Sequence, residues 1–196
     1  MTLRDSNAAV SREARRSRIK DASLRMAAEG GYEAVQMRAV AERADVSLGT
    51  IYRYFNGKDD MLLAGLVSWI QRVREGLESR PPQQGTAADR LSALLADAAE
   101  MAERTPKLMS ALFTALNTTD PAAAEYKRAV ETEVLQFMVT AIGDDSEIDA
   151  EGAARVIRHV WFSATSRWVG GLAEAGSVED ELRHAVRMMI ACKASA

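Results

Sequence analysis

Residues whose types and spacing could do chemistry gather between Met37 and Leu62, in the stretch MRAVAERADVSLGTIYRYFNGKDDML. Apolar residues spaced i, i+3, i+4 and i+7 predict a helix over residues 37–44, and the same spacing predicts another over 48–55. The turn formers Asp45-Val46-Ser47 separate them, and Ser47 can cap the second helix. Two short helices joined by such a turn predict a helix-turn-helix, whose second helix enters the major groove of DNA.

The sequence offers few residues that could support enzymatic catalysis. It contains two histidines, His159 and His184, and a single cysteine, Cys192. The motifs GxSxG, HExxH, CxxC, GxxxxGK[ST] and GxGxxG are absent from the sequence. We therefore expect no enzyme, no cofactor and no metal site, and we interpret His159 as a structural residue.

The charge is distributed unevenly. The whole chain has a net charge of −3, which argues weakly against a nucleic-acid partner. Residues 1–20, however, carry six Arg and Lys residues against Asp5 and Glu13, a net of 6 − 2 = +4. A basic arm on a mildly acidic body suits a DNA-reading domain joined to a domain with another task. The alternative is a solvated, disordered tail, which the adjoining helix-turn-helix makes the weaker interpretation.

The composition predicts an all-α fold. Breakers are sparse, with 12 Gly and 4 Pro, and good helix formers are abundant. Apolar periodicity predicts about nine helices and no strand. We expect an N-terminal arm and helix-turn-helix domain over residues 1–57, and a second helical domain over 58–196.

Several helix ends carry local signals. A first helix is expected over about residues 12–29, ended by Gly30-Gly31. Two pairs resemble capping boxes that open later helices, Thr86 with Asp89 and Ser177 with Asp180. The other expected features are loops over residues 79–85 and 143–149, and a long helix over about residues 150–175.

The sequence also bears on the compartment. It has no run of about eighteen apolar residues that could span a membrane, and its N-terminus lacks the apolar region of a signal peptide. A single cysteine gives no disulfide framework and suits a reducing compartment. We expect a cytoplasmic protein without a membrane partner.

A family resemblance rests on several motifs. They are Gly30-Gly31-Tyr32, Ala39-Val40-Ala41, Val46-Ser47, and the run from Gly49 to Phe55 followed by Lys58. In type, spacing and position they resemble the DNA-binding domain of TetR-family repressors. Within that family, EGGYEAVQMRAVAERADVSLGTIYRYF is similar to the actinobacterial repressors of cholesterol and steroid catabolism. The later stretches ARVIRHVWFSATSRW and LRHAVRMMI resemble the same subgroup more loosely.

The resemblance implies which residues contact DNA: Gln36, Arg38, Ser47, Leu48, Gly49, Thr50, Tyr52, Arg53, Tyr54 and Lys58. Arg38 is expected to reach a base edge or a phosphate, and Tyr52 and Lys58 to fix the register on phosphates. Core packing is an equally good interpretation of Tyr54. For Arg38 and Lys58 the alternative is an ordinary solvated charge.

The resemblance also implies that the domain over residues 58–196 binds an effector and forms a homodimer. The pairing surface is expected on the last two long helices, at Val156, Val160, Ala164, Leu182, Val186 and Met189. The residues expected to line an effector pocket are Met101, Met109, Phe113, Phe137, Trp161 and Trp168. Plain core packing is the more common role of such residues. The implied effector is a small apolar molecule, such as a steroid or acyl-coenzyme A metabolite.

One rival class of function stays open at this point. A helical ligand-binding or adaptor protein without DNA affinity would explain the acidic body of the chain. It would not explain a helix-turn-helix beside a basic arm. Loss of DNA binding on charge reversal at Arg38 and Lys58 distinguishes the two classes.

Overall fold

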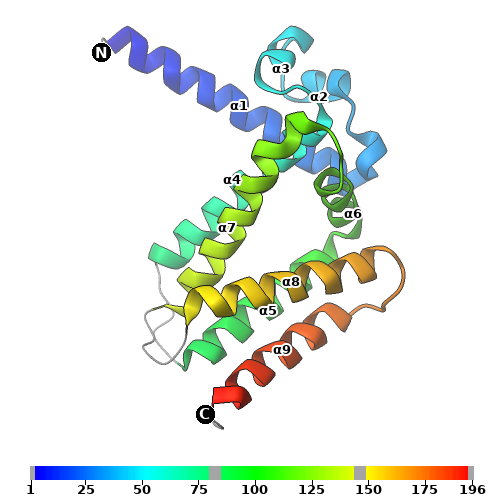
Figure 1. Ribbon diagram of the computed structural model, residues 1–196. Coiled ribbons are helices and arrows are strands. Elements are labelled where there is room, and N and C mark those ends of the chain that lie inside the picture. The colour runs from blue at the N-terminus through cyan, green and yellow to red at the C-terminus, as the bar shows by residue number, and fades with distance from the viewer. Residues whose placement is uncertain (1–2, 80–84, 144–148, 194–196) are drawn as a thin grey trace. The chain divides into compact units, whose positions relative to one another are not determined.

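The computed structural model describes residues 3–79, 85–143 and 149–193, with side chains described for residues 10–79, 85–143 and 149–189. Within these ranges the chain forms nine α-helices, two short 3-10 helices and no strand (Figure 1), which confirms the predicted all-α fold. The helices are α1 (Leu3–Gly30), α2 (Met37–Arg43), α3 (Leu48–Tyr54), α4 (Lys58–Ser79), α5 (Ala87–Arg104), α6 (Pro106–Leu116), α7 (Ala124–Ile142), α8 (Ala150–Val169) and α9 (Ser177–Lys193). The 3-10 helices are η1 (Tyr32–Ala34) and η2 (Pro121–Ala123).

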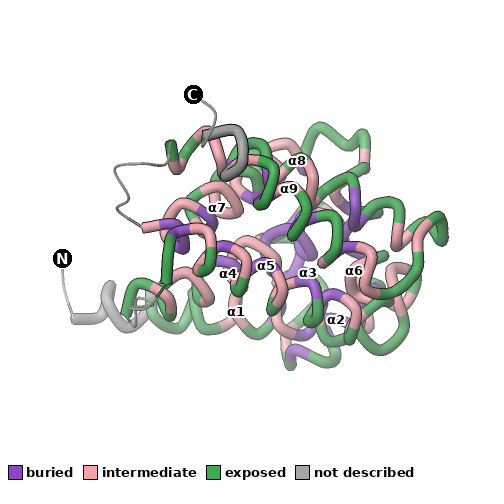
Figure 2. Tube along the Cα trace, turned by 90° about the horizontal axis from the view of Figure 1, so that it is seen from below, coloured by how far each residue is buried: buried purple, intermediate pink, exposed green. Residues whose placement is uncertain are grey.

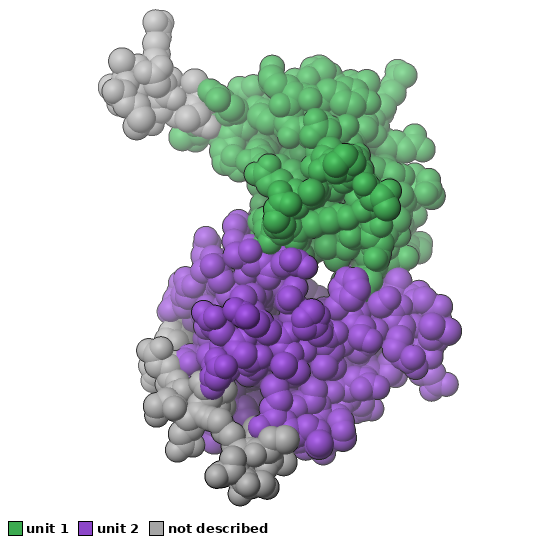
Figure 3. Space-filling model, in the orientation of Figure 1, with its two compact units in different colours: residues 1–68, 107–130 green, residues 69–106, 131–196 purple. Residues whose placement is uncertain are grey.

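The chain packs into two compact units, shown in different colours in Figure 3. Unit 1 combines residues 1–68 with residues 107–130, and unit 2 combines residues 69–106 with residues 131–196. Helices α4 and α7 each begin in unit 1 and end in unit 2. This division reflects packing within the chain and does not test where the functional domains divide. The boundary expected after residue 57 therefore stays a prediction.

The core of unit 1 is built on α1, which packs against α2 and η1, while α2 packs against α3. Apolar side chains buried here come from all four N-terminal helices: Ile19, Ala22, Ala27, Val40, Ala41, Ile51, Met61, Leu62 and Leu63. Buried positions are interspersed with exposed ones along these helices (Figure 2), as expected of amphipathic helices. This core fixes the short helices α2 and α3, which are too short to be stable alone.

The core of unit 2 lies where α9 packs against α5 and α8. Its buried members include Leu91 and Leu95 of α5, Ile157 of α8 and Leu182 of α9. The predicted capping box at Thr86 is confirmed: its hydroxyl accepts from the Asp89 backbone, and the Asp89 carboxylate accepts from the Thr86 backbone. The box starts α5 in the register that turns its apolar stripe inward.

Three helix ends differ from the predictions. Helix α1 begins at Leu3 rather than near residue 12, because no breaker stands before that point. Helix α8 ends at Val169 rather than near residue 175, since Gly171 takes a left-handed φ of 73°. The capping box expected at Ser177 is wrong: this residue is already helical, and its buried Oγ has no hydrogen-bond partner among the described residues.

Parts of two predicted loops, residues 80–84 and 144–148, lie outside the described residues. In the described part of the chain, every helix is too short or too polar to cross a bilayer.

Candidate nucleic-acid interface

The predicted helix-turn-helix is present, and its turn is closed by specific hydrogen bonds. Asp45 takes a left-handed φ of 53°, which aspartate tolerates better than most residues, and the Val46 N–H donates to the Ala41 carbonyl at 3.0 Å. Ser47 is the N-cap of α3, and its Oγ accepts from the Thr50 N–H at 3.1 Å. The start of the recognition helix is therefore fixed by its own sequence.

One face of α3 is buried and the other is open. Ile51 is fully buried, whereas Leu48, Tyr52 and Arg53 are exposed, with 56% of Tyr52 accessible. Gly49 is also exposed, and a Cβ added there would lie 4.0 Å from its nearest neighbour, Ser47 Oγ. Packing within the chain therefore does not require glycine at this position.

Helix α2 presents two further predicted contacts. Gln36 is its N-cap in extended conformation, exposed and without a capping hydrogen bond from its side chain. The Arg38 side chain is 85% exposed and lies 3.6 Å from Glu42 in an ion pair one turn along the helix. Such surface pairs contribute about 0.3–0.5 kcal/mol, so Arg38 can exchange Glu42 for another acceptor at little cost.

Lys58 is held in position by neighbouring residues. Its Nζ lies 3.6 Å from the centre of the Tyr32 ring and 3.8 Å from a carboxylate oxygen of Glu33. The Tyr32 hydroxyl donates to Asp59 Oδ1 at 2.6 Å. Burial, with this hydrogen bond, raises the pKa of Tyr32 well above its ordinary value, so the hydroxyl stays a neutral donor.

Tyr54 has features of both core packing and a surface position. Its ring is partly buried beside Phe55, with ring centres 6.4 Å apart, and the Arg53 guanidinium lies 5.4 Å from the Tyr54 ring centre. Its hydroxyl oxygen is buried without a hydrogen-bond partner in the described residues. This tyrosine also lines a cavity of about 320 Å³ with Arg12, Glu13, Arg16 and Arg53.

Residues of α1 that sequence reasoning missed hold the helix-turn-helix in place. Arg43 of α2 donates to both carboxylate oxygens of Glu29, at 2.5 and 2.6 Å, and this bond lowers the pKa of Glu29. Arg18 Nε donates to the carbonyl of Ala44 at 3.3 Å, at the end of α2. The sequence shows these residues of α1 only as charges, because the pattern along one helix does not reveal its tertiary partners.

The six residues expected to line an effector pocket are divided between the units. Met109 and Phe113 lie on α6 in unit 1, whereas Met101, Phe137, Trp161 and Trp168 lie in unit 2. Trp161 and Trp168 pack, partly buried, against the core of unit 2. None of the six lines the 320 Å³ cavity or a second one, of about 30 Å³, beside Leu95 and Leu182.

The six residues expected at a dimer interface differ in exposure. Ala164, Leu182 and Val186 are buried in the core of unit 2, so their side chains are already covered within one chain. Val160 and Met189 are partly buried. Val156 is 51% exposed. The same helices also expose Phe162 and Met188, which were not predicted as pairing residues.

Comparisons with known proteins agree with this architecture. The family described as bacterial regulatory proteins of the tetR family matches residues 19–64, and the tetracyclin repressor-like C-terminal domain matches residues 85–189. The HTH-type transcriptional repressor KstR of Mycolicibacterium smegmatis is 38% identical over 177 residues, which are 90% of this chain and 87% of the relative. This relative supports the predicted likeness to steroid-catabolism repressors.

Two solved structures share the fold. A TetR transcriptional regulator from Rhodococcus sp. RHA1 superimposes with a TM-score of 0.78 at 27% identity, over 92% of this chain and 97% of that one. Thermus thermophilus FadR, solved in complex with lauroyl-CoA, gives a TM-score of 0.71 at 21% identity, over 89% and 93%. The relatives are named as transcriptional regulators and repressors, which confirms the expectation of a regulator rather than an enzyme. The chain belongs to the TetR family of bacterial regulatory proteins and is a helix-turn-helix transcriptional repressor.

Proposed function

We propose that this repressor binds a near-palindromic DNA operator as a homodimer and leaves it when a small apolar effector binds. The open face of α3 carries the proposal: Leu48, Gly49 and Tyr52 face away from a core that the same helix fills with Ile51. A helix placed in this way can enter the major groove. Two modules related by a two-fold axis would read half-sites about 34–36 Å apart.

We assign roles on the DNA from the chemistry of each side chain. Leu48 and the methyl group of Thr50 suit thymine methyls, since Thr50 Oγ1 is engaged with Ser47 Oγ at 2.9 Å. Arg38 suits a guanine edge or a phosphate. The phosphate contacts are assigned to Gln36, Tyr52, Arg53 and Lys58. Tyr54 has a supporting role, because its ring packs beside Phe55.

The proposed pairing surface is the outward side of α8 and α9. Val156, Phe162 and Met188 are exposed there, and each is a large apolar side chain. The predicted residues Leu182 and Val186 support this surface from beneath, since they fill the core on which α9 packs. A dimer also follows from affinity, because one module of this size buries a small interface on DNA.

The proposed effector is a steroid or an acyl-coenzyme A compound, bound in unit 2. The class rests on the likeness to KstR, and the Thermus FadR complex adds that a protein of this fold holds lauroyl-CoA. Of the four predicted residues in unit 2, Phe137, Trp161 and Trp168 stay candidates because each is partly buried, whereas Met101 is 40% exposed. The effector releases DNA by binding one state of the dimer more tightly than the other. With DNA as partner, the proposed location is the cytoplasm.

The decisive test is binding of the purified protein to the DNA upstream of its own gene, measured against salt concentration. We expect saturable, sequence-dependent binding that weakens steeply as salt rises. Charge reversal, Arg38→Glu with Lys58→Glu, should abolish binding while the helical circular dichroism spectrum stays unchanged. Equally weak binding to every fragment, in a genome-wide selection as well, would favour the adaptor protein instead.

A further inference from the structure

The polypeptide chain enters or leaves unit 1 at three points, and a residue of α1 forms a hydrogen bond near each of them. The chain leaves this unit after Ser68, returns at Lys107 and leaves again after Val130. Lys20 Nζ donates to Ser68 Oγ at 2.7 Å, and Lys107 Nζ donates to the Glu29 carbonyl at 3.0 Å. Near the third point, Arg16 Nη2 donates to the Tyr126 hydroxyl at 2.9 Å. Every one of these contacts lies within unit 1.

A polar network on α1 joins two of these contacts. One carboxylate oxygen of Glu13 lies 3.6 Å from Lys20 Nζ, and the other lies 4.0 Å from Arg16 Nη1. Lys20 is only 7% exposed, so its hydrogen bond to Ser68 is largely shielded from water. The network therefore runs from α7, at Tyr126, to α4, at Ser68.

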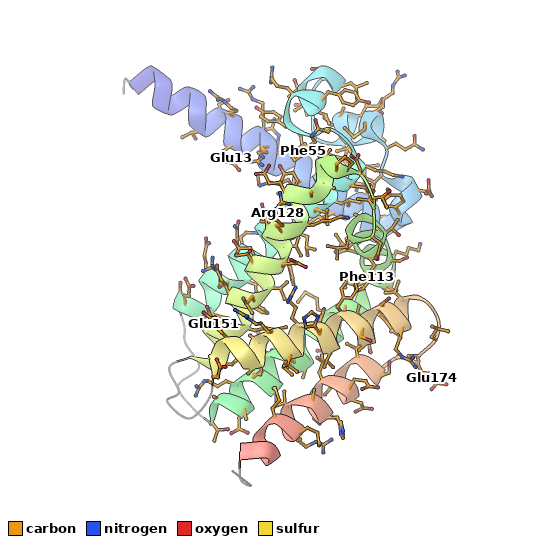
Figure 4. All side chains as sticks on the ribbon, viewed as in Figure 1. Glu13, Phe55, Phe113, Arg128, Glu151 and Glu174 are labelled. Atoms are coloured by element: carbon orange, nitrogen blue, oxygen red, sulfur yellow. The ribbon has the colours of Figure 1, made fainter. Side chains whose placement is uncertain are left out.

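Arg16 also contacts the end of the recognition helix. Its guanidinium carbon lies 5.9 Å from the centre of the Phe55 ring. Phe55 is the C-cap of α3 and is 2% exposed (Glu13 and Phe55 are labelled in Figure 4). One guanidinium thus contacts both the last turn of α3 and the first turns of α7.

Beyond unit 1, α4 and α7 stay tied to each other. Within unit 2, the Glu133 carboxylate of α7 accepts from Gln71 Nε2 at 2.7 Å and from Arg74 Nη2 at 3.3 Å, both on α4. The same two helices carry Ser68, on α4, and Tyr126, on α7. Both of these residues end on the α1 network.

We propose that Arg16 and Tyr126 are a positioning pair that couples α7 to the recognition helix. While the Tyr126 hydroxyl accepts from Arg16, the guanidinium stays over the Phe55 ring and the C-terminal end of α3 is well ordered. When α7 moves this hydroxyl away, Arg16 loses an acceptor and the end of α3 becomes more mobile. The link to effector release rests on the proposed function, whereas the contact between Tyr126 and α3 does not.

The test is hydrogen exchange of residues 48–55, read by mass spectrometry on the full chain without DNA. Tyr126→Phe removes only the hydroxyl and should raise exchange in this segment about two- to thirtyfold, the range expected for a coupling of this kind. Lys127→Met is the matched control, since Lys127 on the same turn of α7 bonds the Thr118 carbonyl rather than α1. Unchanged exchange of residues 48–55 in Tyr126→Phe would overturn the proposal.

A second variant separates coupling from general destabilisation. Arg16→Met should raise exchange of residues 48–55, and adding Tyr126→Phe to it should raise that exchange no further, because both changes break one link. Effects that multiply would refute the pair. Operator affinity is measured in parallel, so failure of the wild type to bind DNA would count against the proposed function and leave the exchange result intact.

Discussion

The Tyr32 hydroxyl and the Asp59 carboxylate form a 2.6 Å hydrogen bond that joins η1 to the first turn of α4. Lys58, the residue before Asp59, lies against the face of the same ring. A single tyrosine therefore orients both the start of α4 and the lysine proposed to contact phosphate. The ring contacts Lys58 and the hydroxyl bonds Asp59, so substitutions can separate the two contributions.

Tyr32→Phe should lower the free energy of unfolding by about 1 kcal/mol, because the Asp59 carboxylate loses a donor while the ring stays. Operator affinity should change little, since Lys58 keeps its contact with the ring. Urea denaturation measures the first effect, with Tyr52→Phe as the control, because Tyr52 is exposed. Equal stability of the Tyr32→Phe variant and the wild type would contradict the assignment.

Ser47 caps the N-terminus of α3 and also lies at the proposed DNA surface. Ser47→Ala should cost about 1 kcal/mol of stability, because the Thr50 N–H loses its acceptor. Ser47→Asp should keep the cap and the stability but weaken operator binding, since its carboxylate would face phosphates. Denaturation and DNA titration of both variants test this, and undiminished DNA binding by Ser47→Asp would place Ser47 away from the DNA.

The helix-turn-helix could be predicted from sequence because its determinants are local. Apolar spacing, the turn at Asp45 and the cap at Ser47 all lie within a few residues of one another, and each is present in the structure. The Arg16–Tyr126 contact could not be predicted, since the two residues are 110 positions apart and polar spacing carries no partner information. An apolar stripe on a helix is ambiguous in a similar way. In the sequence, Leu182 fits a dimer interface or a core equally well, and in the structure it is buried where α9 packs against α5.

The outward and inward sides of α8 and α9 should respond differently to substitution. Val156→Glu with Met188→Glu should shift the protein from dimer to monomer in sedimentation without unfolding it, because both side chains are exposed. Leu182→Ala should instead cost about 2–5 kcal/mol of stability by leaving a cavity in the unit 2 core. A stable dimer in the double Glu variant would move the pairing surface elsewhere.

The capping box of α5 should make stability depend on pH. Hydrogen bonds from the Thr86 hydroxyl and backbone lower the pKa of Asp89 below its ordinary value of 3.8. The folded state therefore binds this proton less tightly than the unfolded state. The resulting stability is present above the ordinary pKa and is lost as the pH falls through the lowered one.

Asp89→Asn should flatten this part of the acid dependence, since asparagine does not titrate. Urea denaturation over a series of acidic pH values measures it, and Asp97→Asn on the same helix provides a charge-matched control. An acid dependence that persists unchanged in Asp89→Asn would assign it to other carboxylates.

Lys58 and Arg38 should differ in what they contribute on DNA. Lys58→Gln removes a proposed phosphate contact, so affinity should fall on every sequence and the slope of log K against log salt should decrease by about 0.9. Arg38→Gln should cost about 1–3 kcal/mol on the operator and relax the preference at one base pair if Arg38 reads guanine. Arg104→Gln is the control, since this exposed arginine in unit 2 pairs with Glu100. An unchanged slope for Lys58→Gln would mean that the Tyr32 ring and Glu33 retain the lysine on the protein instead of offering it to phosphate.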